Sequence, residues 1–285
     1  RYTWLDASAR VRPLRPSVIA PDGYARVIHE PGSFGEWLRT LPLRPPNTSV
    51  KSYAGDVLHE GDDGRIAAVV EIDCGKADLQ QCADAIMRLR AEYLFSIGKL
   101  GEISFNATSG DAMPFSRWIR GERASFSGNK LKWVSGGKQE ANHAALRTYL
   151  DIVFAYAGTH SLEKELTPVA DKDLQIGDVF IKGGFPGHAV IVVDLAVDEA
   201  GSKRFLLAHP GSTADVYPVR RLFSAVDVEA VDLQLFPRFA RVRLSVATLE
   251  PTDALFIPKG WWHHVRALST AMNLSLTGFP GQVTT

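Results

Sequence analysis

The stretch IGDVFIKGGFPGHAVIVVDLAVDEAGSKRFLLA, residues 176–208, decides the fold. It contains three runs rich in β-branched and aliphatic residues, at 178–182, 188–195 and 204–207, and this composition predicts strands. Glycines precede the second run, and Asp-Glu-Ala-Gly at 198–201 supplies a turn before the third. We therefore expect neighbouring strands to pair antiparallel in one sheet.

Two amphipathic helices precede this sheet. Residues 78–96 carry an apolar stripe at steps of three and four, and Asp78 and Gln81 have the spacing of a capping box. A second helix is expected at 141–157, where Gly158 supplies the stop. Helices that precede and cover an antiparallel sheet indicate an α+β fold.

The remaining segments are less regular. Residues 1–50 are rich in proline and arginine, which predicts an extended arm with one short helix at 34–41. Short strands are further expected at residues 64–73, 103–106, 131–134, 240–246, 254–257 and 272–276.

Composition excludes several classes of protein. The chain has 285 residues, of which 45% are hydrophobic and 22% charged, so disorder and collagen-like structure are excluded. Lys+Arg and Asp+Glu both number 32, so bulk charge does not favour nucleic acid as a partner. The longest apolar runs fall far short of the ~20 residues that a membrane span requires. Two cysteines do not identify the compartment, and the opening residues show no leader, so the sequence leaves the location unknown.

Cys82 is the candidate nucleophile. It stands at about the fourth position of the expected helix, where unpaired backbone N–H groups and the helix dipole lower the pKa of a thiol. Cysteine is also among the most often buried residue types, and Cys82 lies on the apolar stripe, so a structural role is the alternative. The thiol indicates catalysis only if a base lies beside it.

His188 and His209 are the candidate partners of the thiol. His188 opens the second expected strand after a glycine-rich turn, where a helix N-terminus packed on the sheet can reach it. If the turn is centred near residues 198–199, paired positions sum to about 397, so His209 faces His188 across the ladder. We expect His188 to act as base and His209 to orient its ring. A structural role is the alternative for either histidine.

Three further residues are candidates for substrate contact. Gln80 or Gln81, beside the thiol, could donate to an oxyanion, although Gln81 is also needed for the helix cap. Trp118 could line a groove formed by the loops of residues 108–123, and core packing is its alternative role.

Four motifs closely resemble the bacterial domain of unknown function family 4846. They are PGSFGEWLR at 31–39, DLQQCADAIMRLRAEYL at 78–94, YAGTHSLEKEL at 156–166 and IGDVFIKGGFPGHAVIVVD at 176–194. The resemblance covers residues 1–208, and the family name supplies no activity. The order of the cysteine, Gly-Asp-Val-Phe and Gly-His-Ala-Val is also similar to that of NlpC-type papain-like peptidases and amidases. That similarity implies a papain-like core and suggests export to the periplasm or cell envelope.

The resemblance to family 4846 stops after Leu207, because His209 stands where that family's pattern would continue with glutamine. Beyond it, LEPTDALFIPKGWWHHV at 249–265 looks like the C-terminal half of a JmjC-type cupin, the iron- and 2-oxoglutarate-dependent oxygenases. This resemblance implies that His263 binds iron and that Lys203 binds the 2-oxoglutarate carboxylate. His188 occupies the place of the histidine in the upstream His-x-Asp pair.

Position 190 separates these two interpretations of His188. The oxygenase pattern needs a carboxylate there and this chain has Val190, which cannot bind iron. Residues 209–285 are also too few to close an eight-stranded jelly roll, so we expect an incomplete one.

The sequence therefore predicts a papain-like domain at 1–208, with helices on an antiparallel sheet, and a cupin-like β segment at 209–285. The leading hypothesis is a cysteine hydrolase that cleaves an amide in a small peptide or cell-wall fragment, with no cofactor. Cys82, His188 and His209 would form its triad. The first alternative is an Fe(II)- and 2-oxoglutarate-dependent oxygenase, or its inactive relative, that uses His188, His263 and Lys203. The second alternative is a non-catalytic binding module.

Overall fold

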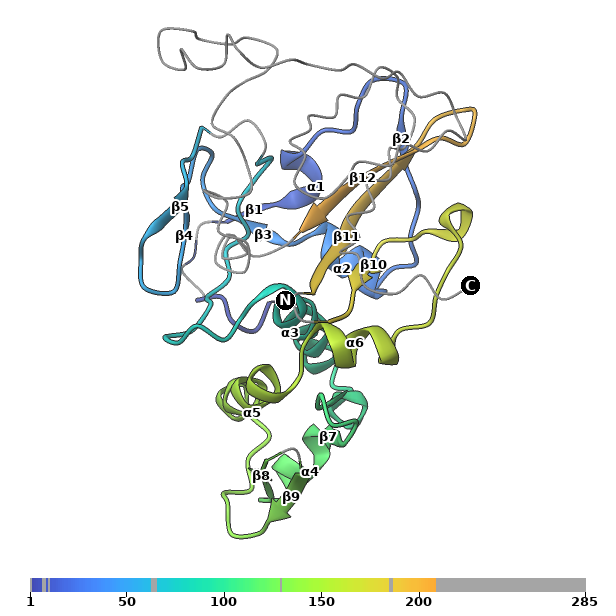
Figure 1. The fold of residues 1–285 in the computed structure, drawn as a ribbon. Coiled ribbons are helices and arrows are strands. Elements are labelled where there is room, and N and C mark those ends of the chain that lie inside the picture. The colour runs from blue at the N-terminus through green and yellow to red at the C-terminus, as the bar shows by residue number, and fades with distance from the viewer. Residues whose placement is uncertain are drawn as a thin grey trace, which may run out of the picture. The chain divides into compact units, whose positions relative to one another are not determined.

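The structure is a computed structural model that describes residues 2–6, 9, 11–62, 66–128, 130–184 and 187–208 (Figure 1). Three sets of predictions lie outside these residues: the tail strands, His209 and His263. The described part of the chain is a mixed α+β structure with several small antiparallel sheets, which confirms the predicted α+β class. No helix among these residues is long and apolar enough to cross a membrane.

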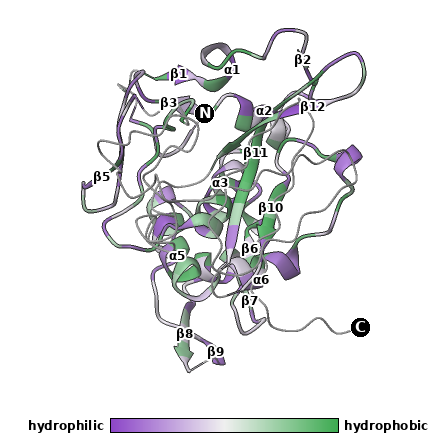
Figure 2. Ribbon diagram, turned by 45° about the horizontal axis from the view of Figure 1, so that its top comes forward, coloured by the Kyte–Doolittle hydropathy of each residue, from purple (hydrophilic) through white to green (hydrophobic). Residues whose placement is uncertain are grey.

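The largest sheet is built from the stretch 176–208. It contains β10 (Val179–Lys182), β11 (His188–Val197) and β12 (Lys203–Ala208) in that order, all antiparallel. The short strand β2 (Ala25–Arg26) also pairs with β11. The three predicted strands are thus confirmed. Figure 2 shows that β10 and β11 are hydrophobic over most of their length, which favours buried strands.

The register between β11 and β12 differs from the prediction. Val197 pairs with Lys203 and Ile191 with Ala208, so paired positions sum to 399 or 400 instead of 397. The position of the turn accounts for the shift. It is centred on Ala200, where the Asp198 N–H donates to the Ser202 carbonyl, which gives the sum of 400. A β-bulge between Val192 and Asp194 then adds one residue to β11 and lowers the sum to 399 beyond it.

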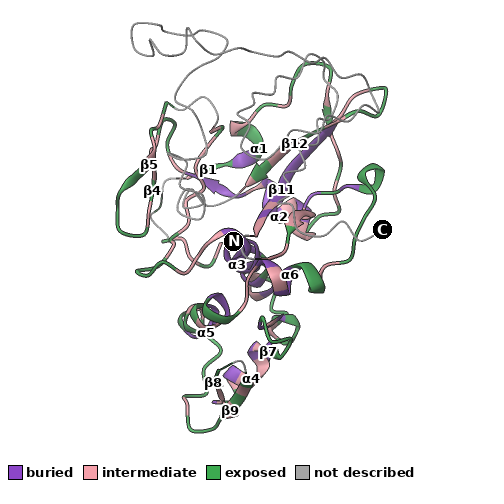
Figure 3. Cartoon of the chain, in the orientation of Figure 1, coloured by how far each residue is buried: buried purple, intermediate pink, exposed green. Residues whose placement is uncertain are grey.

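Helix α3 (Cys82–Ser96) packs on β11 and is buried over most of its length (Figure 3). Its buried side chains include Ile86, Met87 and Leu89, and β11 contributes Ile191 to the same core. Helices α5 (His143–Tyr156) and α6 (Thr159–Glu165) pack against α3. The helices predicted at 78–96 and 141–157 are present as α3 and α5, and α6 was not predicted.

The start of α3 differs from the prediction. The helix begins at Cys82 and not at residue 78, and Gln81 is its N-cap. The carboxylate of Asp84 accepts a hydrogen bond of 2.9 Å from the Gln81 backbone N–H. The capping acid is therefore three residues after the N-cap, and the predicted box at Asp78 and Gln81 is wrong.

The N-terminal arm is tied to the main sheet, and it contains the expected helix as α2 (Phe34–Arg39). Asp194 of β11 accepts hydrogen bonds from Arg26 Nε at 2.7 Å and from Arg39 Nε at 2.9 Å. Because Arg39 and Asp194 are both buried, these ion pairs fix the arm against the sheet.

The apolar run at 66–73 makes only an isolated bridge between Val70 and Leu43, so the strand predicted there is wrong within the described residues. Its partner segment contains Pro42, whose carbonyl accepts from the Glu71 N–H but which has no N–H to return.

The other described elements are short. The paired strands are β1 (Arg12–Pro13) with β3 (Pro42–Leu43), β4 (Val50–Lys51) with β5 (Val57–His59), β6 (Ser104–Asn106) with β7 (Ala112–Pro114), and β8 (Arg123–Ser127) with β9 (Lys130–Val134). The short helices are α1 (Leu14–Ser17), α4 (Phe115–Ile119), η1 (Leu100–Glu102) and η2 (Asp171–Asp173).

Candidate functional site

The start of α3 meets the start of β11. Cys82 is the first residue of the helix, and its thiol lies within hydrogen-bonding reach of the backbone N–H of Ala189. Ala189 follows His188, the first residue of β11. The fold thus brings the candidate nucleophile to the strand end that carries the candidate base.

The environment of the Cys82 thiol raises its pKa. Burial is the largest cause, since only 7% of the residue is exposed, and the nearby Asp84 carboxylate acts in the same direction. The backbone N–H groups of Ala189 and Ala83 oppose this shift without overcoming it. The expectation that the helix start lowers the thiol pKa is therefore wrong, because desolvation outweighs the helix N–H groups.

Asp84 is a buried carboxyl group that the sequence analysis did not identify. Only 6% of the residue is exposed, and burial raises its pKa to about 7. One carboxylate oxygen accepts from the Gln81 N–H, and the other, Oδ1, is buried with no hydrogen-bond partner among the described residues. The sequence signal for the hydrogen bond between the Gln81 N–H and Asp84 was an acid two residues after the cysteine that starts the helix.

His188 is partly buried and pairs with Lys182 of β10. Side chains alternate between the two faces of a strand, so the ring of His188 lies on the opposite face from the buried Ala189 methyl group. The third predicted member of the triad, His209, lies outside the described residues.

The residues predicted to contact substrate are engaged elsewhere. The Gln80 side-chain carbonyl accepts a hydrogen bond of 3.0 Å from Arg88, and Gln81 forms the N-cap. Trp118 of α4 is buried, and the guanidinium of Arg123 lies 4.2 Å from its ring centroid. These contacts are those of packed, structural side chains.

A buried ionic cluster lies in the middle of α3. Arg88 and Glu92 are both 0% exposed and join through a 2.6 Å hydrogen bond. Glu92 also binds Nε2 of His143, at 2.8 and 3.0 Å, and Arg88 binds the Asp73 carboxylate at 3.0 Å. Burial alone would raise the pKa of Glu92, but His143, Arg88 and Thr3 lower it. The cluster joins α3 to α5, to the segment at Asp73 and to the N-terminal arm.

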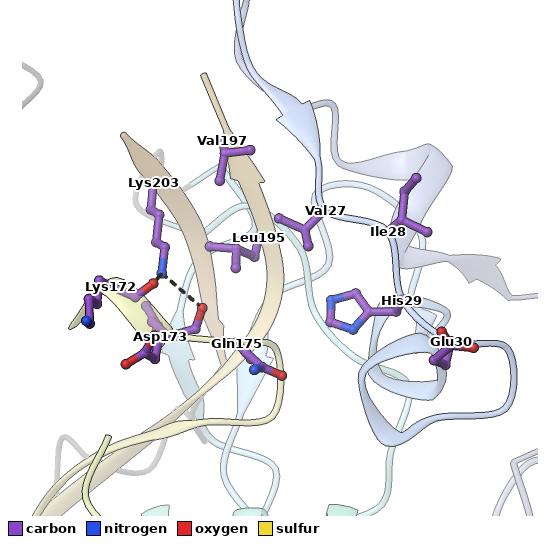
Figure 4. Close-up of a pocket in the computed structure, with 11 residues that line it drawn as sticks. Val27, Ile28, His29, Glu30, Lys172, Asp173, Gln175, Leu195, Val197 and Lys203 are labelled. Atoms are coloured by element: carbon purple, nitrogen blue, oxygen red, sulfur yellow. Dashed lines mark hydrogen bonds between the residues drawn. The ribbon is translucent and has the colours of Figure 1, made fainter. Parts of the chain in front are cut away.

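Two positions of the oxygenase pattern, Lys203 and Val190, do not fit their expected roles in the described residues. The ammonium group of Lys203 donates to three backbone carbonyls, those of Asp171, Lys172 and Leu174. These bonds use all three donors of a lysine. Figure 4 draws the bonds to Lys172 and Leu174. Val190 pairs with Phe180 and supplies no ligand atom. Within the described residues, no group of three His, Cys, Asp or Glu side chains could hold a metal ion, and His263 lies outside them.

Two family models match this chain. A mixed α+β domain with one main antiparallel sheet spans most of the described chain, and the model of the family described as "Domain of unknown function (4846)" matches residues 14–215. This chain belongs to that family. A second model, "Cupin-like domain", matches residues 195–278, which overlaps β12 and continues beyond the described residues.

The curated relatives match only a part of this chain. HSPB1-associated protein 1 homolog of Danio rerio is 42% identical over 74 residues, which are 24% of this chain and 16% of that protein. Jumonji C domain-containing protein 5 of Drosophila melanogaster is 35% identical over 79 residues, 26% of this chain and 20% of that protein. Lysine-specific demethylase 8 of Xenopus tropicalis is 35% identical over 79 residues, 26% of this chain and 18% of that protein. No solved structure matches the chain.

Proposed function

We propose that this chain is a relative of the JmjC-type oxygenases that does not itself carry out iron- and 2-oxoglutarate-dependent oxidation. The cupin-like match at 195–278 and the Jumonji C and demethylase relatives support the relationship. This chain spans only 16–20% of the three relatives described above, so their activities belong to those proteins.

One observation is the main support for the proposed lack of oxygenase activity. To bind the 2-oxoglutarate carboxylate, a lysine must have an N–H group that is not already hydrogen-bonded. The Lys203 ammonium group already donates to three carbonyls. Val190 adds to this argument, because it stands where the oxygenase pattern places a carboxylate ligand. A metal held by two imidazoles alone would be bound weakly.

The test is a succinate assay with Fe(II), ascorbate and 2-oxoglutarate, with an active JmjC-domain oxygenase as positive control. We expect no succinate from the chain above the level of its His263→Ala variant. Succinate formation that requires both His263 and Lys203 would contradict the proposal.

A specific contact favours a second candidate, a papain-like cysteine hydrolase. The Cys82 thiol at the start of α3 lies against the Ala189 N–H, next to His188. In this proposal residues 1–208 contain a papain-like core, and His188 removes the thiol proton while Cys82 attacks an amide carbonyl of a peptide or cell-wall fragment. His209 orients the imidazole, and His188 returns the proton to the leaving amine. Since burial raises the thiol pKa, this chemistry depends on that base.

Alkylation by iodoacetamide tests this candidate, and the chain supplies its own control. Cys82 is buried whereas Cys74 is half-buried, so the variants Cys74→Ser and Cys82→Ser each report on one thiol. A hydrolase requires that Cys82 react faster at pH 7 than a free thiol and that His188→Ala abolish the difference. If Cys82 reacts more slowly than Cys74, the hydrolase is excluded and a non-catalytic binding module is favoured.

A further inference from the structure

A cavity of about 550 Å³ lies between the arm, the segment around η2, and the far ends of β11 and β12 (Figure 4). Its size falls within the range of small-molecule sites, roughly 300–1,000 Å³. It is distinct from the site at Cys82: Leu195 in its wall is seven positions from His188 along β11, which is roughly 23 Å of strand.

Aliphatic side chains form one wall of this cavity. Val27 comes from the arm, and Leu195 and Val197 come from β11. Ile28 stands beside them with 93% of its surface exposed. These side chains can bury an apolar group of a ligand.

Two uncharged polar side chains face the aliphatic wall. Figure 4 shows the imidazole of His29 extending toward Leu195 and Gln175. The Nε2 atom of His29 is buried and has no hydrogen-bond partner among the described residues. Burial lowers the pKa of His29, and the nearby charge of Arg39 lowers it further, so the ring is neutral at pH 7. A neutral imidazole and an amide can each donate or accept a hydrogen bond.

The charged residues of the cavity favour neither an anionic nor a cationic ligand. The ammonium group of Lys203 is satisfied by three backbone carbonyls. Lys172, Asp173 and Glu30 have exposed side chains at the rim and include both signs. A strongly charged ligand would therefore find no buried counter-ion in this cavity.

We propose that this cavity binds a short uncharged peptide segment, with an aliphatic side chain against Leu195 and Val197 and a backbone amide hydrogen-bonded to His29 and Gln175. The proposal does not depend on the function of Cys82 or of the cupin-like segment. It assigns a partner to the Nε2 atom of His29, which has none among the described residues, and it uses the two uncharged polar side chains among the described residues that line the cavity.

Titration with N-acetyl-leucine methylamide, followed by ¹H–¹⁵N correlation spectra of the full chain, tests the proposal. We expect shifts at residues 27–29, 175 and 195–197. Affinity should be at least tenfold higher than for N-acetyl-glycine methylamide, which lacks the side chain, and for zwitterionic leucine. Equal affinity for the three probes, or shifts confined to other residues, would overturn the proposal.

Two variants locate the hydrogen bonds. His29→Phe keeps a ring of similar shape without the nitrogen and should weaken binding at least tenfold, and the exposed Gln175→Ala should weaken it about threefold. His160→Phe, which changes a histidine of α6 outside the cavity, is the matched control and should stay within twofold. If His29→Phe fails to fold, Gln175→Ala decides: unchanged affinity in that variant overturns the proposal.

Discussion

Ionisable side chains at the start and in the middle of α3 have pKa values that are shifted in opposite directions. At its start, Cys82 and Asp84 are buried with few partners, and the pKa of each is raised. Two turns further on, Arg88 and Glu92 are completely buried, yet Glu92 has its pKa lowered because His143, Arg88 and Thr3 all bind it. Burial alone therefore does not set the charge state in this helix; the number of hydrogen-bond partners does.

Breaking the well-paired end should have the largest effect. Glu92→Ala would leave the Arg88 guanidinium buried beside His143 without its nearest carboxylate. We expect a loss of about 3–5 kcal/mol in the free energy of unfolding, the cost typical of a buried ion pair that loses one partner. Urea denaturation at pH 7 measures it. A loss below 1 kcal/mol would mean that solvent reaches the cluster.

The poorly paired end should show its effect in the pH dependence of stability. The pKa of Asp84 is raised to about 7 in the folded protein, from its ordinary value of 3.8, so the folded state binds a proton more tightly than the unfolded state. The stability that Asp84 contributes is therefore present below pH 4 and lost as the pH rises through 7, on the order of 4 kcal/mol in total. Asp84→Asn should remove this part of the pH dependence. If both proteins show the same profile between pH 4 and 8, the carboxyl group is not buried.

An exposed ion pair just after α3 provides the contrast to the buried Arg88–Glu92 pair. Lys99 and Glu102 form a 2.8 Å ion pair in which each side chain is 53% exposed. Glu102→Ala should change stability by less than about 0.5 kcal/mol, because solvent screens such pairs. The effect, measured in the same urea titrations, should shrink further in 0.5 M NaCl. A loss approaching that of Glu92→Ala would contradict the distinction between the two environments.

Sequence reasoning predicted the elements better than their exact alignment. The three strands of the main sheet follow from short runs of β-branched residues. Runs of this kind that are flanked by glycines are typical of strands. The register was predicted wrongly because the turn is centred on Ala200 and not near residues 198–199, and the β-bulge between Val192 and Asp194 changes the alignment by one more residue. The start of α3 was misplaced because Asp78 and Gln81 have the spacing of a capping box, whereas the helix uses Gln81 as its N-cap and Asp84 as the acid three residues later.

The candidate site was predicted in part. A cysteine at a helix start and a histidine at a strand start were the sequence signals, and the thiol of Cys82 lies near the backbone N–H of Ala189, the residue after His188. The meeting of thiol and imidazole stays a prediction. The raised thiol pKa was not predicted, because desolvation depends on the side chains that surround the thiol. The Arg88–Glu92 cluster was also missed, since an arginine and a glutamate four residues apart are typical of a solvent-exposed helix face. The roles of His209 and His263 remain predictions.

The double ion pair at Asp194 sets a lower limit on any fragment of this protein that can fold. Arg26 and Arg39 both reach that one carboxylate, and Arg39 also donates to the carbonyls of Val27 and Leu195. An expression fragment that starts after residue 40 would strand a negative charge inside the sheet with neither guanidinium beside it. Domain boundaries chosen for crystallisation should therefore keep the arm, although its own secondary structure is sparse.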